Sequence, residues 1–90
     1  MEEKNFIKIN CLRLYRKKNG LSQKRAAYLM GFKTASSLSH YEKGDKVPSL
    51  KNALKLENVL HTPVAFLFRE LNENLRKEIE SQREKIALTR

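Results

Sequence analysis

Glycine, proline and serine divide this chain into short segments that favour helices. Gly20, Gly31 and Gly44 each follow a stretch of helical periodicity, and glycine is the residue that most often ends a helix. Ser22 and Ser49 come directly before such stretches, where a hydroxyl group can cap the first backbone N–H groups. The pattern predicts helices over residues 6–19, 23–30, 35–43 and 50–60, and a fifth helix that begins at Thr62-Pro63.

No stretch alternates apolar and polar residues in the manner of a strand, so we expect an all-α fold. Asn5 and Thr34 are the expected caps of the first and third helices. Ala26 and Ala27 are small enough to let two helices cross closely. The other expected core residues are Ile9, Leu12, Leu21, Met30, Phe32, Leu38, Tyr41, Leu50, Leu54, Leu60, Val64 and Leu67.

Charge divides the chain into two parts. Of its 90 residues, 19 are Lys or Arg and 10 are Asp or Glu. Residues 1–68 contain 13 of these basic residues against 5 acidic ones, whereas residues 69–90 contain 6 against 5. We therefore expect a basic domain over residues 1–68 and a C-terminal amphipathic helical extension over residues 69–90. So basic a domain most often binds nucleic acid and less often a membrane surface.

The composition argues against other classes of protein. The longest apolar run, residues 64–68, is too short to span a bilayer, and the start Met1-Glu2-Glu3 does not resemble a secretory signal. The single cysteine, Cys11, cannot form an internal disulfide or a Cys-rich zinc site, which suits the cytoplasm. His40, His61 and Cys11 offer neither a nucleophile–base pair nor metal-ligand spacing. We expect no enzyme activity, no metal and no cofactor.

The C-terminal extension has an interrupted apolar stripe. Leu71, Leu75, Ile79 and Ile86 recur at helical spacing, and Gln82 breaks the series. One interpretation is a frayed amphipathic helix, and another is a helix that packs on the domain or on a second copy of the chain. A full coiled coil is the less expected form, because Asn72 and Gln82 fall on its seam within about three heptads.

Two short helices joined by a tight turn at Gly31, followed by Gly44 and a restart at Pro48-Ser49, are typical of a helix-turn-helix. The residues that carry this pattern are Arg16, Gly20-Leu21-Ser22-Gln23, Ala27, Met30-Gly31, Leu38, Tyr41-Glu42-Lys43-Gly44, Pro48-Ser49-Leu50, Leu54 and Leu56. Their order and spacing over about residues 8–68 resemble the Cro/lambda-repressor-like (XRE) family. The resemblance implies a compact five-helix, double-stranded-DNA-binding domain whose recognition helix, residues 35–43, enters the major groove.

By this resemblance, the base-reading positions are held here by Ala35, Ser36, Ser39 and His40. Lys33, just before the helix, is a further candidate with a long side chain. None of these residues is Arg, Gln or Asn, so we expect modest direct readout, with DNA shape adding selectivity. His40 has the most reach along the helix, and a guanine acceptor is its expected target. The alternative for Ser36, Ser39 and His40 is a solvated helix surface.

Phosphate contacts are expected at two places. The first is the start of the second helix, where the resemblance implies that Gln23 contacts a phosphate; the second is the loop over residues 44–49. The candidates are Ser22, Gln23, Lys24, Arg25, Lys43, Lys46 and Lys51. Arg13, Lys17 and Lys18 are more simply explained as a soluble helix face. Glu42 shares a helix side with apolar residues and needs a cation as it enters the core, and the resemblance implies that Arg16 supplies it.

The sequence thus predicts a sequence-specific transcriptional regulator, acting as a repressor and binding a near-palindromic operator as a homodimer. The C-terminal helix is a candidate dimer contact. Two alternatives stay open: a DNA-binding antitoxin whose extension binds a protein partner, and a protein-interaction module that has lost sequence reading. The short side chains of Ala35, Ser36 and Ser39 are the best argument for the second alternative. Tyr28 and Leu29 are a possible contact surface, and His61 is expected to end a helix in a left-handed conformation.

Overall fold

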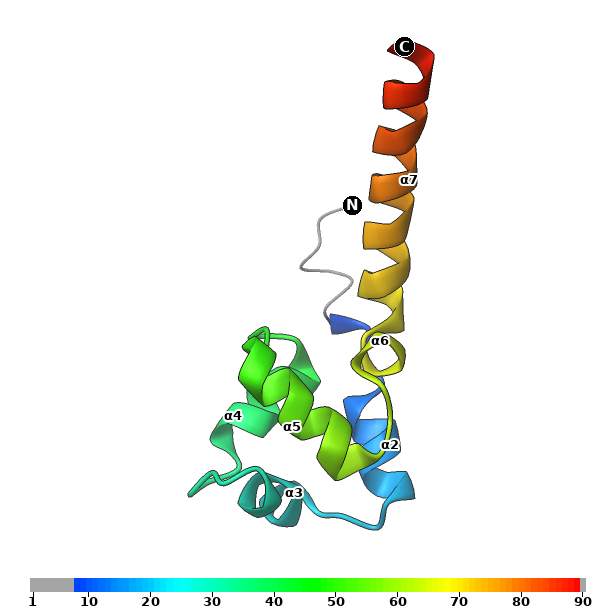
Figure 1. Cartoon of the computed structure of the whole chain (residues 1–90). Helices are drawn as coiled ribbons and strands as arrows, with labels where there is room; N and C mark the ends of the chain where they lie inside the picture. The colour runs from blue at the N-terminus through cyan, green and yellow to red at the C-terminus, as the bar shows by residue number, and fades with distance from the viewer. Residues whose placement is uncertain (1–7, 90) are drawn as a thin grey trace.

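The computed structural model describes residues 8–89, which form helices and no strand (Figure 1). The predicted all-α fold is confirmed. Five helices, α2 to α6, precede a long helix, α7, within the described residues. The bounds are Leu12–Lys18 for α2, Gln23–Leu29 for α3, Ser36–Lys43 for α4, Leu50–Leu60 for α5, Val64–Leu67 for α6 and Arg69–Thr89 for α7.

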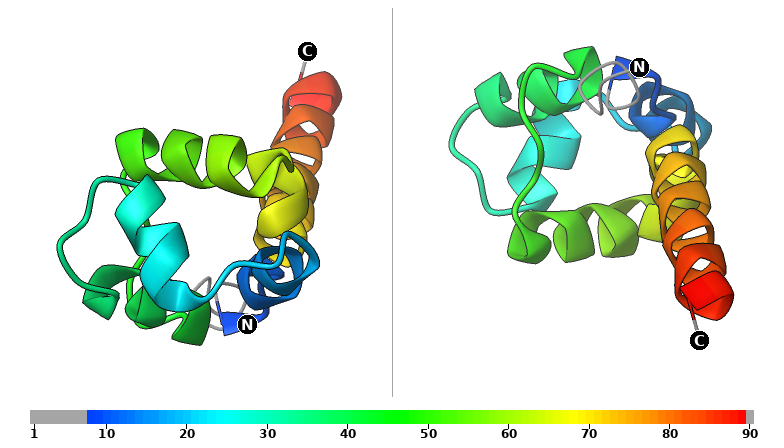
Figure 2. Two further views of the ribbon diagram at one scale, coloured as in Figure 1. Left: turned by 90° about the horizontal axis from the view of Figure 1, so that it is seen from below. Right: turned by 90° about the horizontal axis from the view of Figure 1, so that it is seen from above.

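Helices α2 to α6, which we call the body together with their connecting loops and Phe68, surround one apolar core (Figure 2). Ala26 and Ala27 are both buried, and α3 packs against α4 as two helices with small facing residues can. The buried apolar residues are Leu12, Ala26, Ala27, Met30, Leu38, Tyr41, Leu56, Leu60, Leu67 and Phe68. Every helix of the body therefore contributes at least one side chain to the core.

Several helix ends form as predicted. The Ser22 hydroxyl oxygen accepts a hydrogen bond from the Arg25 N–H at 3.1 Å, and that of Ser49 accepts one from the Asn52 N–H at 3.2 Å. Gly44 ends α4 with a φ of 78°, and a Cβ at this position would lie 2.5 Å from the Cα of Lys8. Both the backbone conformation and the close approach of Lys8 require glycine there. His61 ends α5 with a φ of 51°, the left-handed conformation expected for it.

The prediction of one helix over residues 6–19 is wrong within the described residues, and its predicted cap, Asn5, lies outside them. The helical path is interrupted at Ile9 and Asn10, and α2 begins at Leu12. The Asn10 side-chain oxygen accepts from the Leu12 N–H at 3.1 Å, and the Cys11 N–H donates to the Leu67 carbonyl oxygen at 2.8 Å. These bonds take the backbone groups that a continuous helix would use.

Two predicted caps are also wrong. Helix α4 begins one residue later than expected, with Ala35 at the cap position, although the Thr34 hydroxyl oxygen accepts from the Ser36 N–H at 3.4 Å. Thr62 is buried, and its hydroxyl donates to the Leu60 carbonyl oxygen at 2.9 Å. Pro63 therefore takes the cap position, and α6 starts at Val64.

The core prediction fails on one face of α5 and at the start of the body. Leu50 is 77% exposed, and Leu54 and Ile9 are also exposed, whereas Leu56 and Phe68 are buried. Leu56 and Leu60 define the core side of α5, and Leu50 and Leu54 lie about 100° and about 140° around the helix from that line. A helix with apolar residues on two adjacent faces does not reveal from sequence which face is buried.

Helix α7 leaves the body beside α6 and extends away from α3 and α4 (Figure 1). Its length gives the molecule a long dimension of 53 Å against 22 and 21 Å for the other two. Leu71 packs against the core, but Leu75 and Ile79 are 36% and 53% exposed. Most of α7 therefore stands clear of the body. Among the described residues, no helix is both long and apolar enough to span a membrane.

Candidate nucleic-acid interface

Helix α4 has one face in the core and one toward solvent. Leu38 and Tyr41 are buried, and Ser36, Ser39 and His40 lie on the other side of the helix, exposed or half-buried. Lys43 continues this outer face and is exposed. The spacing of three and four residues between these positions places them on one stripe. Three of the predicted base-reading residues are thus brought together.

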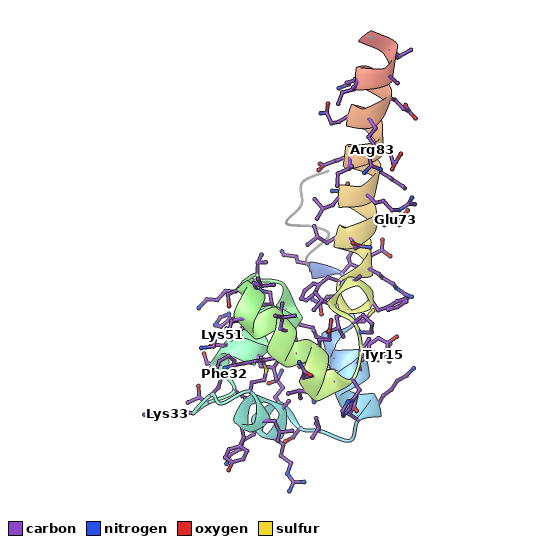
Figure 3. All side chains as sticks on the ribbon, viewed as in Figure 1. Tyr15, Phe32, Lys33, Lys51, Glu73 and Arg83 are labelled. Carbon is purple, nitrogen blue, oxygen red and sulfur yellow. The ribbon has the colours of Figure 1, made fainter. Side chains whose placement is uncertain are left out.

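The other two predicted base-reading residues are placed differently. Ala35 caps α4 and is partly buried against the core, so only part of its methyl group can reach a ligand. Lys33 is exposed and extends outward from the tip of the loop between α3 and α4 (Figure 3). Because its side chain is long, Lys33 can contact a ligand that lies beyond the stripe of residues on α4.

His40 has a neighbour that the sequence interpretation did not consider. Its Nδ1 lies 3.4 Å from the Oδ2 of Asp45, and the two side chains are about half exposed. Asp45 follows the turn at Gly44, which brings residue 45 back beside the last turn of α4. This contact positions the imidazole ring and leaves Nε2 as the ring nitrogen for a further hydrogen bond.

A groove of about 540 Å³ lies between α2, α3 and α4, next to the outer face of α4. Its lining residues are Arg13, Arg16, Ser22, Gln23, Ser39, Glu42 and Lys43. The groove thus collects predicted base-reading, phosphate-binding and ion-pair residues at one place. Arg13 was the residue that sequence reasoning set aside as a soluble face. Its spacing of three residues from Arg16 on α2 is the signal that could have placed it in the groove.

Arg16 and Glu42 form a two-point ion pair in this groove. Arg16 Nε donates to Glu42 Oε2 at 2.7 Å and Nη2 donates to Oε1 at 3.1 Å, while Nη1 donates to the Leu21 carbonyl oxygen at 2.9 Å. The two side chains are 10% and 6% exposed. A buried pair with this geometry fixes the positions of α2 and α4 relative to each other.

Gln23 joins the same network. Its Nε2 donates to Glu42 Oε1 at 3.0 Å, and because the carboxylate only accepts, the amide nitrogen must face it. An amide nitrogen has two N–H donors, so the bond to Glu42 uses one and leaves the other. Arg16 balances the charge of Glu42, and Arg13 and Lys43 then give the groove a positive charge. Hydroxyl, amide and cationic donors of this kind suit an anion such as a phosphate.

The remaining predicted phosphate-binding residues lie on both sides of α4. Lys24 and Arg25 are exposed on α3, where Arg25 lines a separate hollow with Leu21, Tyr28 and Leu29, and Ser22 uses its hydroxyl oxygen as the cap of that helix. Lys46 and Lys51 are exposed beyond the end of α4, in the loop to α5 and on the first turn of α5. Cationic side chains thus flank the outer face of α4 from two directions.

The side chains of Tyr28 and Leu29 are both exposed, on α3. Within the part of the chain that the structure describes, no three His, Cys, Asp or Glu side chains lie close enough together to hold a metal ion.

The comparisons with known proteins agree with this geometry. A family model described as "Helix-turn-helix" matches residues 12–67, which is more than half of the chain. A search of curated proteins finds no significant match. The matched residues run from the start of α2 to the end of α6. The chain therefore belongs to the Cro/lambda-repressor-like (XRE) helix-turn-helix family and is a DNA-binding transcription regulator of that type.

Proposed function

We propose that the chain is a sequence-specific repressor of transcription that binds a near-palindromic operator as a homodimer. In this proposal, α4 lies in the major groove of DNA. Ser36, Ser39 and His40 contact base edges there, and Lys33 reaches an adjacent position. Occupancy of a promoter by such a body blocks access to it, which makes repression the simplest outcome.

The observation that carries the proposal is the position of the positive groove beside the outer face of α4. Ser39 belongs to both surfaces, so a duplex held by a phosphate in the groove brings base edges to α4. Arg13, Gln23 and Lys43 are the proposed phosphate contacts on this side, and Lys46 and Lys51 contact the backbone beyond α4. Lys24 and Arg25 add to the field around the groove. The body's surplus of basic residues supports the same role.

Direct readout by one copy is modest in this proposal, because serine and alanine at the protein–DNA interface reach little of a base edge. Two copies on a symmetric site double the base contacts and the phosphate contacts. Shape and deformability of the operator supply further selectivity.

The proposal is tested by selecting bound duplexes from a random pool and then comparing variants on the selected site. His40→Ala should cost about 1–3 kcal/mol and relax the preference at one base pair of each half-site. The matched control is His61→Asn, which replaces the other histidine by a residue that tolerates the left-handed conformation. An equal loss on specific and random DNA would make His40 a backbone contact.

Gln23→Ala and Arg13→Ala test the groove. Both variants should weaken binding to all sequences to a similar extent, because phosphates carry no sequence information directly. Selective loss on the chosen operator alone would contradict the phosphate role of these residues. Failure of the pool to yield any preferred sequence would support the interaction-module alternative.

The exposed apolar residues of α7 favour one second candidate, a DNA-binding antitoxin whose extension holds a toxin. Co-expression with the product of the neighbouring gene separates the two functions. A stoichiometric complex that neutralises a toxic activity favours the antitoxin, and its absence favours the repressor.

A further inference from the structure

Helix α7 has a length and an exposed apolar surface that its packing against the described part of the chain does not explain. It spans 21 residues, and within residues 8–89 its main contacts are with α6 and, through Leu71, with the core. Isolated helices shorter than about 12–15 residues are marginal in water, and in proteins most of the stability of a helix comes from tertiary packing of its apolar face. Leu75 and Ile79 are exposed on the side that continues the apolar line from Leu71. A partner surface is therefore needed to hold this helix in one conformation.

We propose that α7 forms a parallel, in-register, two-stranded coiled coil with α7 of a second copy of this chain. Asn72, Ile79 and Ile86 take the a positions of the heptads, and Leu75 and Gln82 take the d positions. This assignment deepens the homodimer of the proposed function and rests on it. Asn72, one of the two polar residues that weighed against a coiled coil in the sequence, becomes its register mark.

The core residues match this geometry. β-Branched residues at a with leucine at d favour two parallel strands, and Ile79, Ile86 and Leu75 follow that rule. A single asparagine at an a position specifies register and a two-stranded state at some cost in stability. Asn72 faces its own counterpart only when the two helices run parallel and in register.

The charged residues at the e and g positions favour a parallel pair of helices over an antiparallel one. In a parallel pair, Glu78 at a g position faces Arg83 at the following e position of the other copy, and this contact occurs twice. In an antiparallel pair, Arg76 and Arg83 at e positions face each other, which places like charges together. Arg83 already donates to Glu80 of its own helix at 2.8 Å, and its five N–H donors can serve a second carboxylate.

The start of α7 has an apolar surface that the same partner helix can contact. A shallow hollow at the junction with α6 is lined by Val64, Ala65, Phe68, Leu71, Asn72 and Leu75. This hollow lies on the apolar line that α7 continues, so the first turns of the second copy would cover it. Because α7 extends away from α3 and α4, the pairing leaves the outer face of α4 uncovered (Figure 1).

Sedimentation equilibrium on the full chain without DNA tests the interface. The chain should dimerise, and Ile79→Gln should weaken the dimer at least tenfold. Leu88→Gln, on the opposite face of the same helix, is the matched control and should leave it unchanged. A chain that stays monomeric at 100 μM would overturn the proposal. A dimer that is absent in Leu50→Gln but kept in Ile79→Gln would place the interface on α5 and would also overturn it.

One charge-reversing substitution tests whether the two helices run parallel or antiparallel, because it weakens one kind of dimer and strengthens the other. Arg83→Glu should weaken a parallel dimer roughly three- to tenfold, because it removes two attractive ion pairs between the copies. The double variant Glu78→Arg/Arg83→Glu should restore the dimer. A tighter dimer in Arg83→Glu alone would mean that the helices run antiparallel, since the substitution then removes repulsion.

Cross-linking gives an independent measure. In a Cys11→Ser background, Ile86→Cys should form an intermolecular disulfide rapidly, because parallel helices place both positions side by side. An antiparallel pair would separate them by about 16 Å and leave the thiols free. Selective operator binding by a chain that is monomeric in solution would refute the coiled coil but keep the sequence-specific DNA binding of the proposed function. A parallel dimer that binds all DNA sequences equally would support the coiled coil and refute the sequence-specific DNA binding of the proposed function.

Discussion

The body and α7 use the same ion-pair chemistry in opposite environments. In the body, Arg16 and Glu42 are almost fully buried, share two hydrogen bonds and connect helices that are far apart in sequence. On α7, Glu73–Arg76 and Glu80–Arg83 pair within one turn of a single helix and remain largely exposed. A buried pair specifies a tertiary arrangement, whereas a surface pair supports only the helix on which it lies. The ion pair of the body therefore helps to specify how its own helices pack, whereas the ion pairs of α7 specify no tertiary contact.

The same contrast holds for net charge. The body carries the basic surplus, part of which lines the groove as Arg13 and Lys43, and α7 carries nearly equal numbers of acidic and basic residues. Binding to the DNA backbone is assigned to the body in our proposal, and pairing between copies to α7. Substitutions of the same kind in the two regions should thus have unequal effects.

The largest difference is expected between Glu42→Ala and Glu73→Ala. Removing the Glu42 carboxylate leaves Arg16 buried without its partner, which should cost about 3–5 kcal/mol of unfolding free energy. Glu73→Ala removes an exposed pair and should leave the unfolding free energy nearly unchanged. Denaturant titration followed by circular dichroism measures both. Equal midpoints for the two variants would contradict the structural role of the buried pair.

A smaller effect is expected when alanine replaces glycine at the ends of α3 and α4. Gly31→Ala should cost about 1–2 kcal/mol, because the left-handed φ of 83° is strained for alanine and the added Cβ meets only the end of the Lys55 side chain. Gly44→Ala should cost more, since its Cβ would also meet the backbone of Lys8. Thermal unfolding of the two variants compares them. A smaller loss for Gly44→Ala would mean that the segment around Lys8 does not pack there.

Salt dependence separates the DNA-binding region from α7. Lys46→Ala in the body should reduce the slope of log affinity against log salt by about 0.9 for each phosphate that the protein no longer neutralises, and so by about twice that in a dimer. Lys77→Ala removes the same charge from α7 and should leave the slope unchanged. Fluorescence anisotropy at several salt concentrations gives both slopes. A matching decrease in the two variants would assign DNA binding to α7 as well.

The smallest effect concerns pH and is confined to α7. The Arg76 guanidinium, by its hydrogen bond to the carboxylate, lowers the pKa of Glu73 below its ordinary value. The stabilisation of α7 by this pair is therefore present above the ordinary pKa and is lost as the pH falls through the lowered one. Arg76→Gln should raise the pKa of Glu73, which carboxyl-detected NMR titration measures. An unchanged pKa would mean that the pair does not form in solution.

The parts of the fold that sequence predicted are those with a local physical cause. Ser22, Ser49 and Gly44 act within one turn of the helix that they start or end, so their roles follow from neighbouring residues. The break before α2 could not be predicted in this way. The Asn10 side-chain oxygen accepts a hydrogen bond from the Leu12 N–H. The Cys11 N–H donates to the carbonyl oxygen of Leu67, more than fifty residues away in the sequence.

The candidate site shows the same limit. The periodicity of Leu38 and Tyr41 was enough to predict the outer face of α4. The hydrogen bond of Gln23 to Glu42 and the place of Arg13 in the groove depend on how α2, α3 and α4 meet. The pairing of His40 with Asp45 depends on the turn at Gly44, which folds the chain back. Tertiary contacts of this kind leave no periodic trace in the sequence.

Competition between the selected operator and a scrambled duplex of the same length and composition, at one fixed salt concentration, tests the central claim most directly. Reading of base edges by α4 predicts that the full chain binds the operator at least about 10³-fold more tightly than the scrambled duplex. Equal affinity for the two duplexes would contradict it, and the basic body would then be a binder of DNA backbone alone.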